Sequence, residues 1–153
     1  GDVHDENAYF LGGVSVHAGL FSTAADLSRF ARMYLNGGRL GGVRIVSTAA
    51  VDTFTHVQDA RLSNRALRWE VPNGTNSAGH RLSDRAFGHT GFTGTSIWID
   101  PARDLFVILL TNRVDPTRDN PRLGPVRTAL ADAIATVVDA SHAATATAGG
   151  AIP

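Results

Sequence analysis

Two runs of β-branched and aromatic residues, separated by a short breaker, constrain the fold of this chain most. Residues 96–100 read SIWID, residues 105–110 read LFVILL, and the four residues 101–104 between them read PARD. Such runs favour strands, and a short break that contains proline favours a turn. The sequence therefore predicts an antiparallel hairpin, with residues 87–91 (FGHTG) as a third adjacent strand.

Helical patterns lie on both sides of these strands. The clearest spans residues 24–35, where apolar side chains recur at helical spacing, a hydroxyl cap precedes and the stop signal NGG follows. The same spacing predicts helices over residues 47–57 and 126–138. Shorter extended pieces are expected at residues 43–46 and 68–71. The resulting fold class is α+β: an antiparallel sheet of three or more strands packed against a C-terminal helix and preceded by other helices.

Composition supports one folded domain and excludes several functions. The chain has 153 residues, 43% of them apolar, which is enough for a core. Fourteen basic residues balance fourteen acidic ones, so no net charge attracts nucleic acid or an anionic membrane. The longest apolar run, residues 105–110, is too short for a transmembrane segment. We assign residues 1–140 to the domain and residues 141–153, rich in Ala, Thr and Gly, to a flexible tail.

Cysteine and lysine are both absent from the chain. Without cysteine there is no disulfide, zinc ribbon or thiol nucleophile. Without lysine every basic residue is an arginine, which stays protonated in proteins. A mechanism that needs a deprotonated amine must therefore obtain it from other polypeptide.

A series of motifs surrounds the predicted hairpin. Residues 88–96 read GHTGFTGTS, WIDP follows at 98–101, and LTNR follows at 110–113. Upstream, residues 12–27 read GGVSVHAGLFSTAADL. In order and content these motifs resemble the serine β-lactamase and penicillin-binding-protein family, most closely its class C-like esterase branch. The resemblance covers about residues 3–140.

This resemblance implies an acyl-serine hydrolase that opens an ester, an amide or a β-lactam, with a small-molecule or peptide substrate and no cofactor. Family members take the nucleophile from Ser-x-x-Lys and a second element from Tyr-x-Asn. The first is impossible without lysine, and residues 34–36 (YLN) match the second by letters only, because Asn36 is better placed to stop a helix. We therefore expect residues 1–140 to be the C-terminal portion of an incomplete β-lactamase/transpeptidase-like domain, inactive alone, whose N-terminal part is missing. The family suggests a periplasmic or secreted protein, and a cytoplasmic one stays open.

The motif at residues 88–96 supplies the candidate site. His89 is the candidate catalytic residue, as a hydrogen-bond donor or general acid–base partner. Thr90, Gly91, Phe92 and Thr93 are the expected substrate-binding residues. By the resemblance, the Phe92 N–H is the oxyanion donor of the sheet, and Gly91 permits a close approach of substrate. From the residues alone, these glycines equally fit a bulge or close packing in a strand.

Other clusters and functions stay open. Ser15 approaches a nucleophile-elbow motif, but His17 stands where that motif requires glycine. His4, Asp5, Glu6 and His17 carry metal-capable side chains without a fixed ligand spacing, so no metal ligand is assigned. The alternatives to a hydrolase are a non-catalytic β-lactamase-like module that binds peptide or peptidoglycan, a gene relic, and complementation by a separate N-terminal polypeptide.

Overall fold

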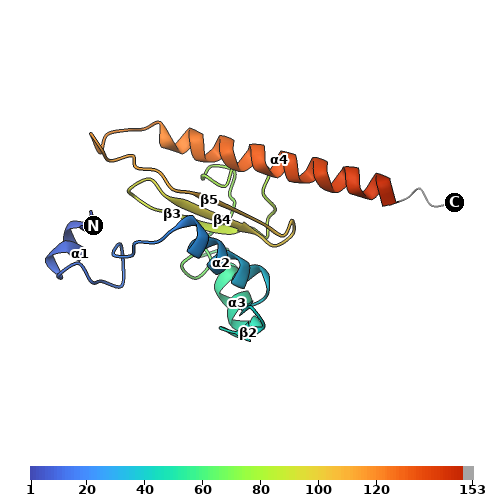
Figure 1. The fold of residues 1–153 in the computed structure, drawn as a ribbon, viewed down its shortest axis with the longest axis horizontal. Helices are drawn as coiled ribbons and strands as arrows, with labels where there is room; N and C mark the ends of the chain where they lie inside the picture. The colour runs from blue at the N-terminus through green and yellow to red at the C-terminus, as the bar shows by residue number, and fades with distance from the viewer. Residues whose placement is uncertain (150–153) are drawn as a thin grey trace.

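The computed structural model describes residues 1–149 and has an α+β fold (Figure 1). A two-stranded and a three-stranded antiparallel sheet are present, the latter with the strand order β3-β4-β5. The elements in chain order are α1 (Glu6–Phe10), α2 (Ala24–Leu35), β1 (Arg39–Leu40), β2 (Val43–Arg44), α3 (Thr48–Thr55), β3 (Phe87–Thr90), β4 (Ser96–Asp100), β5 (Leu105–Leu109) and α4 (Leu123–Gly149). The predicted hairpin and its third strand are confirmed.

The outer edge of β3 is partly paired. Glu70 forms an antiparallel bridge with Gly88: the Glu70 N–H lies 2.8 Å from the Gly88 carbonyl oxygen, and the Gly88 N–H lies 2.9 Å from the Glu70 oxygen. The strand expected at residues 68–71 is thus reduced to single bridges. Because backbone groups alternate in direction along a strand, Thr90, two residues after Gly88, also turns its N–H and carbonyl to this outer edge.

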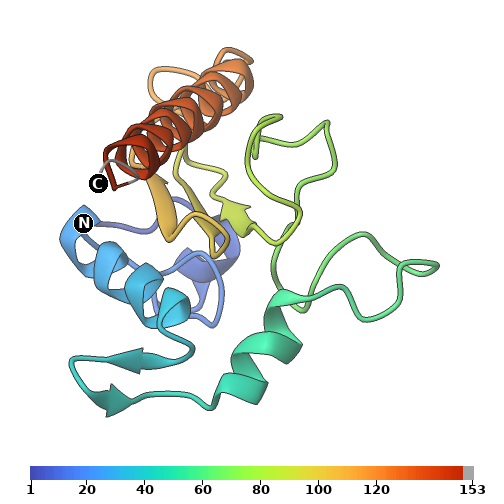
Figure 2. The same ribbon diagram turned by 90° about the vertical axis from the view of Figure 1, so that its right-hand side faces the viewer.

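Helices cover both faces of the three-stranded sheet (Figure 2). On one face, Trp98 and Val107 pack against Ala131 and Ala135 of α4. On the other, Phe87 and Ile99 pack against Ala31 of α2. Alternate residues of a strand point to opposite faces, so β4 contributes side chains to both layers. Trp98, 2% exposed, belongs to the core.

The bounds predicted for α2 are confirmed. The Thr23 hydroxyl accepts the Asp26 N–H at 3.1 Å, as expected for a cap. At the other end the Gly38 and Gly37 N–H groups donate to the carbonyls of Met33 and Tyr34, at 2.8 and 3.0 Å. Both glycines have positive φ, 58° at Gly37 and 91° at Gly38, the conformation that such a helix stop requires.

The C-terminal helix is longer than predicted. We expected it over residues 126–138, whereas α4 begins at Leu123 and continues to Gly149. The extension follows the alanines after residue 139, because alanine has the highest helix propensity. The predicted tail therefore overlaps a helix over residues 141–149, and residues 150–153 lie outside the described residues. Neither α4 nor any other described helix combines the length and apolar character that crossing a bilayer requires.

Candidate active site

The end of β3 places two of the predicted site residues side by side. His89 is exposed and Thr90 is half-buried. His89 shares its face of the sheet with Phe87, two residues earlier, which is the face that α2 covers. Its Nδ1 lies 2.9 Å from the Thr90 carbonyl oxygen. Since a carbonyl only accepts, Nδ1 carries the proton of this bond and Nε2 is left for another partner.

A tight loop, residues 91–95, connects β3 to β4. The Gly91 N–H donates to the Thr95 carbonyl at 2.8 Å, and the Gly94 N–H donates to the Gly91 carbonyl at 3.2 Å. Gly94 is buried with φ 127°, and a Cβ there would run into the backbone of Thr111 and Arg113. A Cβ on Gly91 would collide with the Thr95 hydroxyl. Gly94 is therefore required for the loop itself, whereas a side chain at position 91 would require the Thr95 hydroxyl to move.

The Phe92 N–H makes no hydrogen bond within residues 1–149. The Phe92 side chain is 59% exposed. An unpartnered backbone N–H at the end of a rigid strand can donate to an anionic oxygen. The geometry is therefore compatible with the role that the resemblance implies for Phe92.

Two arginines border this loop. Arg113 donates from Nε to the Phe92 carbonyl oxygen at 2.6 Å, and its guanidinium lies 4.3 Å from the centre of the Phe92 ring. Arg127 of α4 donates from Nη2 to the carbonyls of Gly91 and Thr95, at 2.9 and 2.6 Å. Burial, together with the nearby charge of Arg113, lowers the pKa of the Arg127 guanidinium. No carboxylate within the described residues forms an ion pair with either arginine.

A depression of about 350 Å³ is lined by some of the predicted site residues and not by others. Thr90, Gly91 and Phe92 line it together with both arginines. His89 lies on the α2 side of the sheet and does not line it. Thr93 does not line it either, and its carbonyl accepts the Arg113 N–H at 2.9 Å. The substrate roles of these residues and the catalytic role of His89 stay predictions.

A larger depression, about 570 Å³, runs along α4 next to residues 75–77. Its one titratable side chain is that of Asp132. This carboxylate already accepts the backbone N–H groups of His80 and Arg81, at 2.6 and 3.0 Å. The only titratable side chain that lines the larger depression is therefore already engaged in hydrogen bonds to the backbone.

The N-terminal segment reaches the same end of the sheet. The His4 ring lies 5.9 Å from the Phe92 ring, and Glu6 pairs with Arg118 at 2.6 Å. The other members of the N-terminal cluster also meet. His17 Nδ1 lies 2.8 Å from the Ser15 hydroxyl, and His17 Nε2 lies 3.3 Å from Asp5.

Asp5 is engaged in structure. Its carboxylate caps α1 by accepting the Ala8 N–H at 2.9 Å. That hydrogen bond, followed by the proximity of His17, lowers the pKa of Asp5. Across residues 1–149, no group of three or more metal-capable side chains is gathered.

Sequence reasoning assigned no site role to the two arginines, although Arg113 ends the motif at residues 110–113. Arg127 lies 36 residues from Gly91, and no local pattern announces that contact. The available signal was a lone arginine between Val126 and Leu130, two apolar positions of the predicted helix. Tyr34 was correctly set aside, since its ring packs 5.5 Å from that of Phe87 and Asn36 caps α2.

Comparisons with known proteins place these features in context. The beta-lactamase family model matches residues 1–132. A protein of Salmonella typhi named "Putative D-alanyl-D-alanine carboxypeptidase" is 39% identical over 132 residues, which are 82% of this chain and 30% of the relative. A relative of the same name from Salmonella newport matches equally. The crystal structure of a beta-lactamase from Mycobacterium bovis superimposes with a TM-score of 0.57 at 27% identity, over 76% of this chain and 44% of that one. The chain thus spans about a third of the curated relatives it matches.

Proposed function

The chain belongs to the beta-lactamase family, and on that basis we propose that it forms the C-terminal part of an acyl-serine hydrolase. In this proposal the nucleophilic serine and its lysine belong to polypeptide outside residues 1–153, since the chain has no lysine. The chain contributes the wall of the active site that carries His89 and Phe92. Among acyl substrates, the names of the Salmonella relatives favour a peptide that ends in D-alanyl-D-alanine.

The proposal depends on one observation: two groups without a hydrogen-bond partner among the described residues lie at the same end of β3. The Nε2 of the exposed His89 faces no partner within residues 1–149, and the Phe92 N–H is likewise unpartnered there. Acyl transfer needs a donor for the oxyanion and a group that can move or hold a proton near the leaving atom. This end of the sheet offers one candidate for each.

The proposed reaction follows from these roles. The serine Oγ attacks the substrate carbonyl carbon, its proton passes to the lysine amine, and the carbonyl oxygen becomes an oxyanion. The Phe92 N–H and the N–H of the serine donate to that oxygen. The bond to the leaving group then breaks, and the leaving atom takes the proton held by the lysine, which is passed through Nε2 of the His89 imidazole. Water hydrolyses the acyl-serine and regenerates the hydroxyl.

An exposed apolar surface supports the need for further polypeptide. Along the N-terminal segment, seven large apolar side chains are each 59% or more exposed: Tyr9, Phe10, Leu11, Val14, Val16, Leu20 and Phe21. Soluble domains rarely leave so continuous an apolar stretch uncovered. The missing part of the domain is the proposed cover, because the same segment contacts the candidate site through His4.

The proposal is tested in two steps. The gene region upstream of residue 1 should encode Ser-x-x-Lys in frame. Its absence would favour the non-catalytic module or the gene relic. The longer protein should hydrolyse a D-alanyl-D-alanine peptide, nitrocefin or a chromogenic ester, whereas residues 1–153 alone should hydrolyse none of them.

A substitution then tests the role of His89. In the longer protein, His89→Ala should lower the acylation rate about a hundredfold, the usual contribution of a general acid–base group. The matched control is His142→Ala, because His142 is exposed near the far end of α4. Equal kinetics of the His89 variant and the wild type would reduce His89 to a structural residue.

A further inference from the structure

The Arg127 guanidinium binds the loop that carries the candidate oxyanion donor. Arg127 Nη2 donates to both carbonyls that close the 91–95 loop, those of Gly91 and Thr95. Each of these carbonyls also accepts a backbone N–H from within the loop. Arg127 therefore reinforces both hydrogen bonds that define the loop, although it comes from a different element, α4.

One of those carbonyls shares its peptide unit with the Phe92 N–H. The Gly91 C=O and the Phe92 N–H belong to one planar group, and the Gly91–Phe92 bond is trans. In a trans peptide the two dipoles point in opposite directions. A guanidinium bound to the Gly91 oxygen therefore leaves the Phe92 N–H of the same peptide unit pointing away from that guanidinium.

The same contact strengthens the donor. A cation that binds a peptide oxygen polarises the peptide unit and makes its N–H a better hydrogen-bond donor. The Arg127 charge is well suited to this, because no carboxylate within residues 1–149 forms an ion pair with it. Its Nε is buried and has no partner among the described residues, so its fixed bonds are those to the loop.

We propose that Arg127 is a positioning residue, which aims and polarises the Phe92 N–H through the Gly91 carbonyl. This inference rests on the proposed function, since an oxyanion donor matters only if the site performs acyl transfer. It assigns to α4 a part in positioning the site, in addition to its contacts with the core, with the backbone of residues 80–81, and with Arg103.

The first test needs no hydrolytic activity and measures amide exchange in the longer protein. In Arg127→Gln, amide hydrogen exchange of Gly91 and Gly94 should accelerate about tenfold or more, because their hydrogen bonds lose the reinforcement. Sheet amides such as those of Trp98 and Val107 should keep their protection. The control is Arg122→Gln, which removes the same charge from an exposed arginine next to the same helix. Unchanged exchange at both glycines in Arg127→Gln would overturn the proposal.

A conservative variant covers the case in which Arg127→Gln loosens the whole sheet. Arg127→Lys keeps the charge and three donors on a shorter side chain. Faster exchange confined to Gly91 and Gly94, smaller than in Arg127→Gln, would support the proposal. Exchange accelerated to the same degree at the sheet amides and at the two glycines would overturn it.

The second test uses the longer protein and its kinetics. Arg127→Gln should lower kcat about tenfold or more and leave KM within about twofold, since an oxyanion donor acts in the transition state. Arg127→Lys should restore part of kcat. An unchanged kcat, or a loss in KM alone, would overturn the positioning role. If the wild-type protein hydrolyses nothing, the proposed function fails, and the exchange experiment still decides whether Arg127 holds the loop.

Discussion

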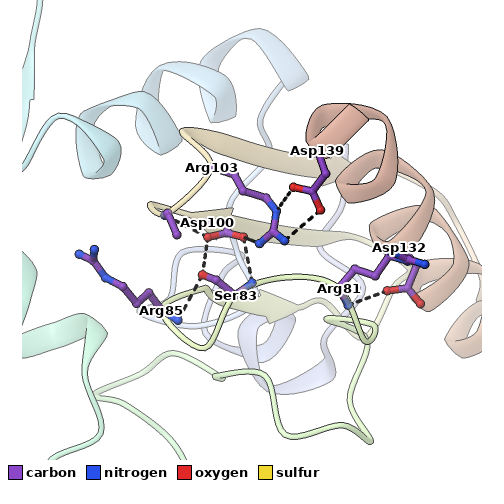
Figure 3. A network of polar contacts seen from close by, with 8 residues as sticks. Arg81, Ser83, Arg85, Asp100, Arg103, Asp132 and Asp139 are labelled. Carbon is purple, nitrogen blue, oxygen red and sulfur yellow. Dashed lines mark hydrogen bonds and ion pairs between the residues drawn. The ribbon is translucent and has the colours of Figure 1, made fainter. Parts of the chain in front are cut away.

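The two ends of the three-stranded sheet are built in opposite ways. At the turn between β4 and β5, the Asp100 side chain is 1% exposed and fully partnered (Figure 3). It accepts the Ser83 N–H at 3.0 Å, the Ser83 hydroxyl at 2.5 Å, the Ala102 N–H at 3.1 Å and Arg103 at 2.9 Å. At the opposite end, where β3 leads into the 91–95 loop, His89 is exposed and the Phe92 N–H has no partner within residues 1–149.

The complete network at the turn stabilises the fold, whereas the unpartnered groups at the loop end are available for chemistry. Around Asp100, Arg103 extends the network to Asp139 of α4 through bonds of 2.8 and 3.1 Å, so the turn, the loop at Ser83 and the helix are joined. Buried polar groups stabilise a fold only when such networks are complete. The loop end keeps donors unused, which stabilises nothing by itself but leaves them available to a substrate.

The largest expected effect on stability is at the turn. Asp100→Asn should lower the free energy of unfolding by about 3 kcal/mol, because it leaves buried donors of Ser83 and Arg103 without a charged acceptor. Urea denaturation measures this. In the control, Asp104→Asn, the loss should stay below about 1 kcal/mol, because Asp104 pairs with Arg32 at the surface and is 73% exposed. Equal losses in the two variants would remove the distinction between the ends.

At the loop end, a substitution that strains the backbone should lower the free energy of unfolding more than the loss of an exposed side chain does. Gly94→Ala should cost about 2 kcal/mol, because alanine disfavours φ 127° and its Cβ meets the backbone of Thr111. Gly74→Ala is the matched control, since Gly74 also has positive φ, 76°, but open space around it. Its cost should be about 1 kcal/mol. A Gly94 variant as stable as the Gly74 variant would show that the loop is not tightly packed.

Acidity should weaken the turn end through Asp139. The hydrogen bonds from Arg103 hold the pKa of this exposed carboxyl below its ordinary value of 3.8. A lowered pKa in the folded state contributes stability above the ordinary pKa, and that contribution is lost as the pH falls through the folded-state pKa. The difference in urea midpoint between the wild type and Asp139→Asn should therefore be largest near neutral pH and vanish in strong acid. A difference that grows in acid would contradict this assignment.

The smallest effect on stability is expected at His89. His89→Ala should change the free energy of unfolding by less than about 0.5 kcal/mol, because the side chain is exposed and its bond to the Thr90 carbonyl is local. Thermal and urea unfolding both measure this. A loss above about 1 kcal/mol would mean that the imidazole serves the fold.

Local signals in the sequence predicted what local interactions determine. The ends of α2 were predicted because Thr23 and Gly37 act within a few residues of the helix. The hairpin of β4 and β5 was predicted from its two apolar runs and their short break. The small β1–β2 hairpin was only half foreseen, as an extended piece after Gly41 and Gly42.

Contacts between distant residues could not be read from the sequence. The pairing of Glu70 with Gly88 and the bonds of Arg127 to the 91–95 loop join segments that no periodic pattern relates. The predicted C-terminal end of α4 was wrong for a different reason. We expected the alanines after residue 139 to bury too little apolar surface to form ordered structure. Their intrinsic helix propensity, however, favours a helix even where the side chains are exposed.

The most direct test of the account is to locate the covalent intermediate. The longer protein is incubated with penicillin, digested, and the acylated peptide is identified by mass spectrometry. The account predicts an adduct on a serine that precedes residue 1 of this chain, formed more slowly in His89→Ala. An adduct on Ser15, which lies beside His17, or on any other serine of residues 1–153 would contradict it.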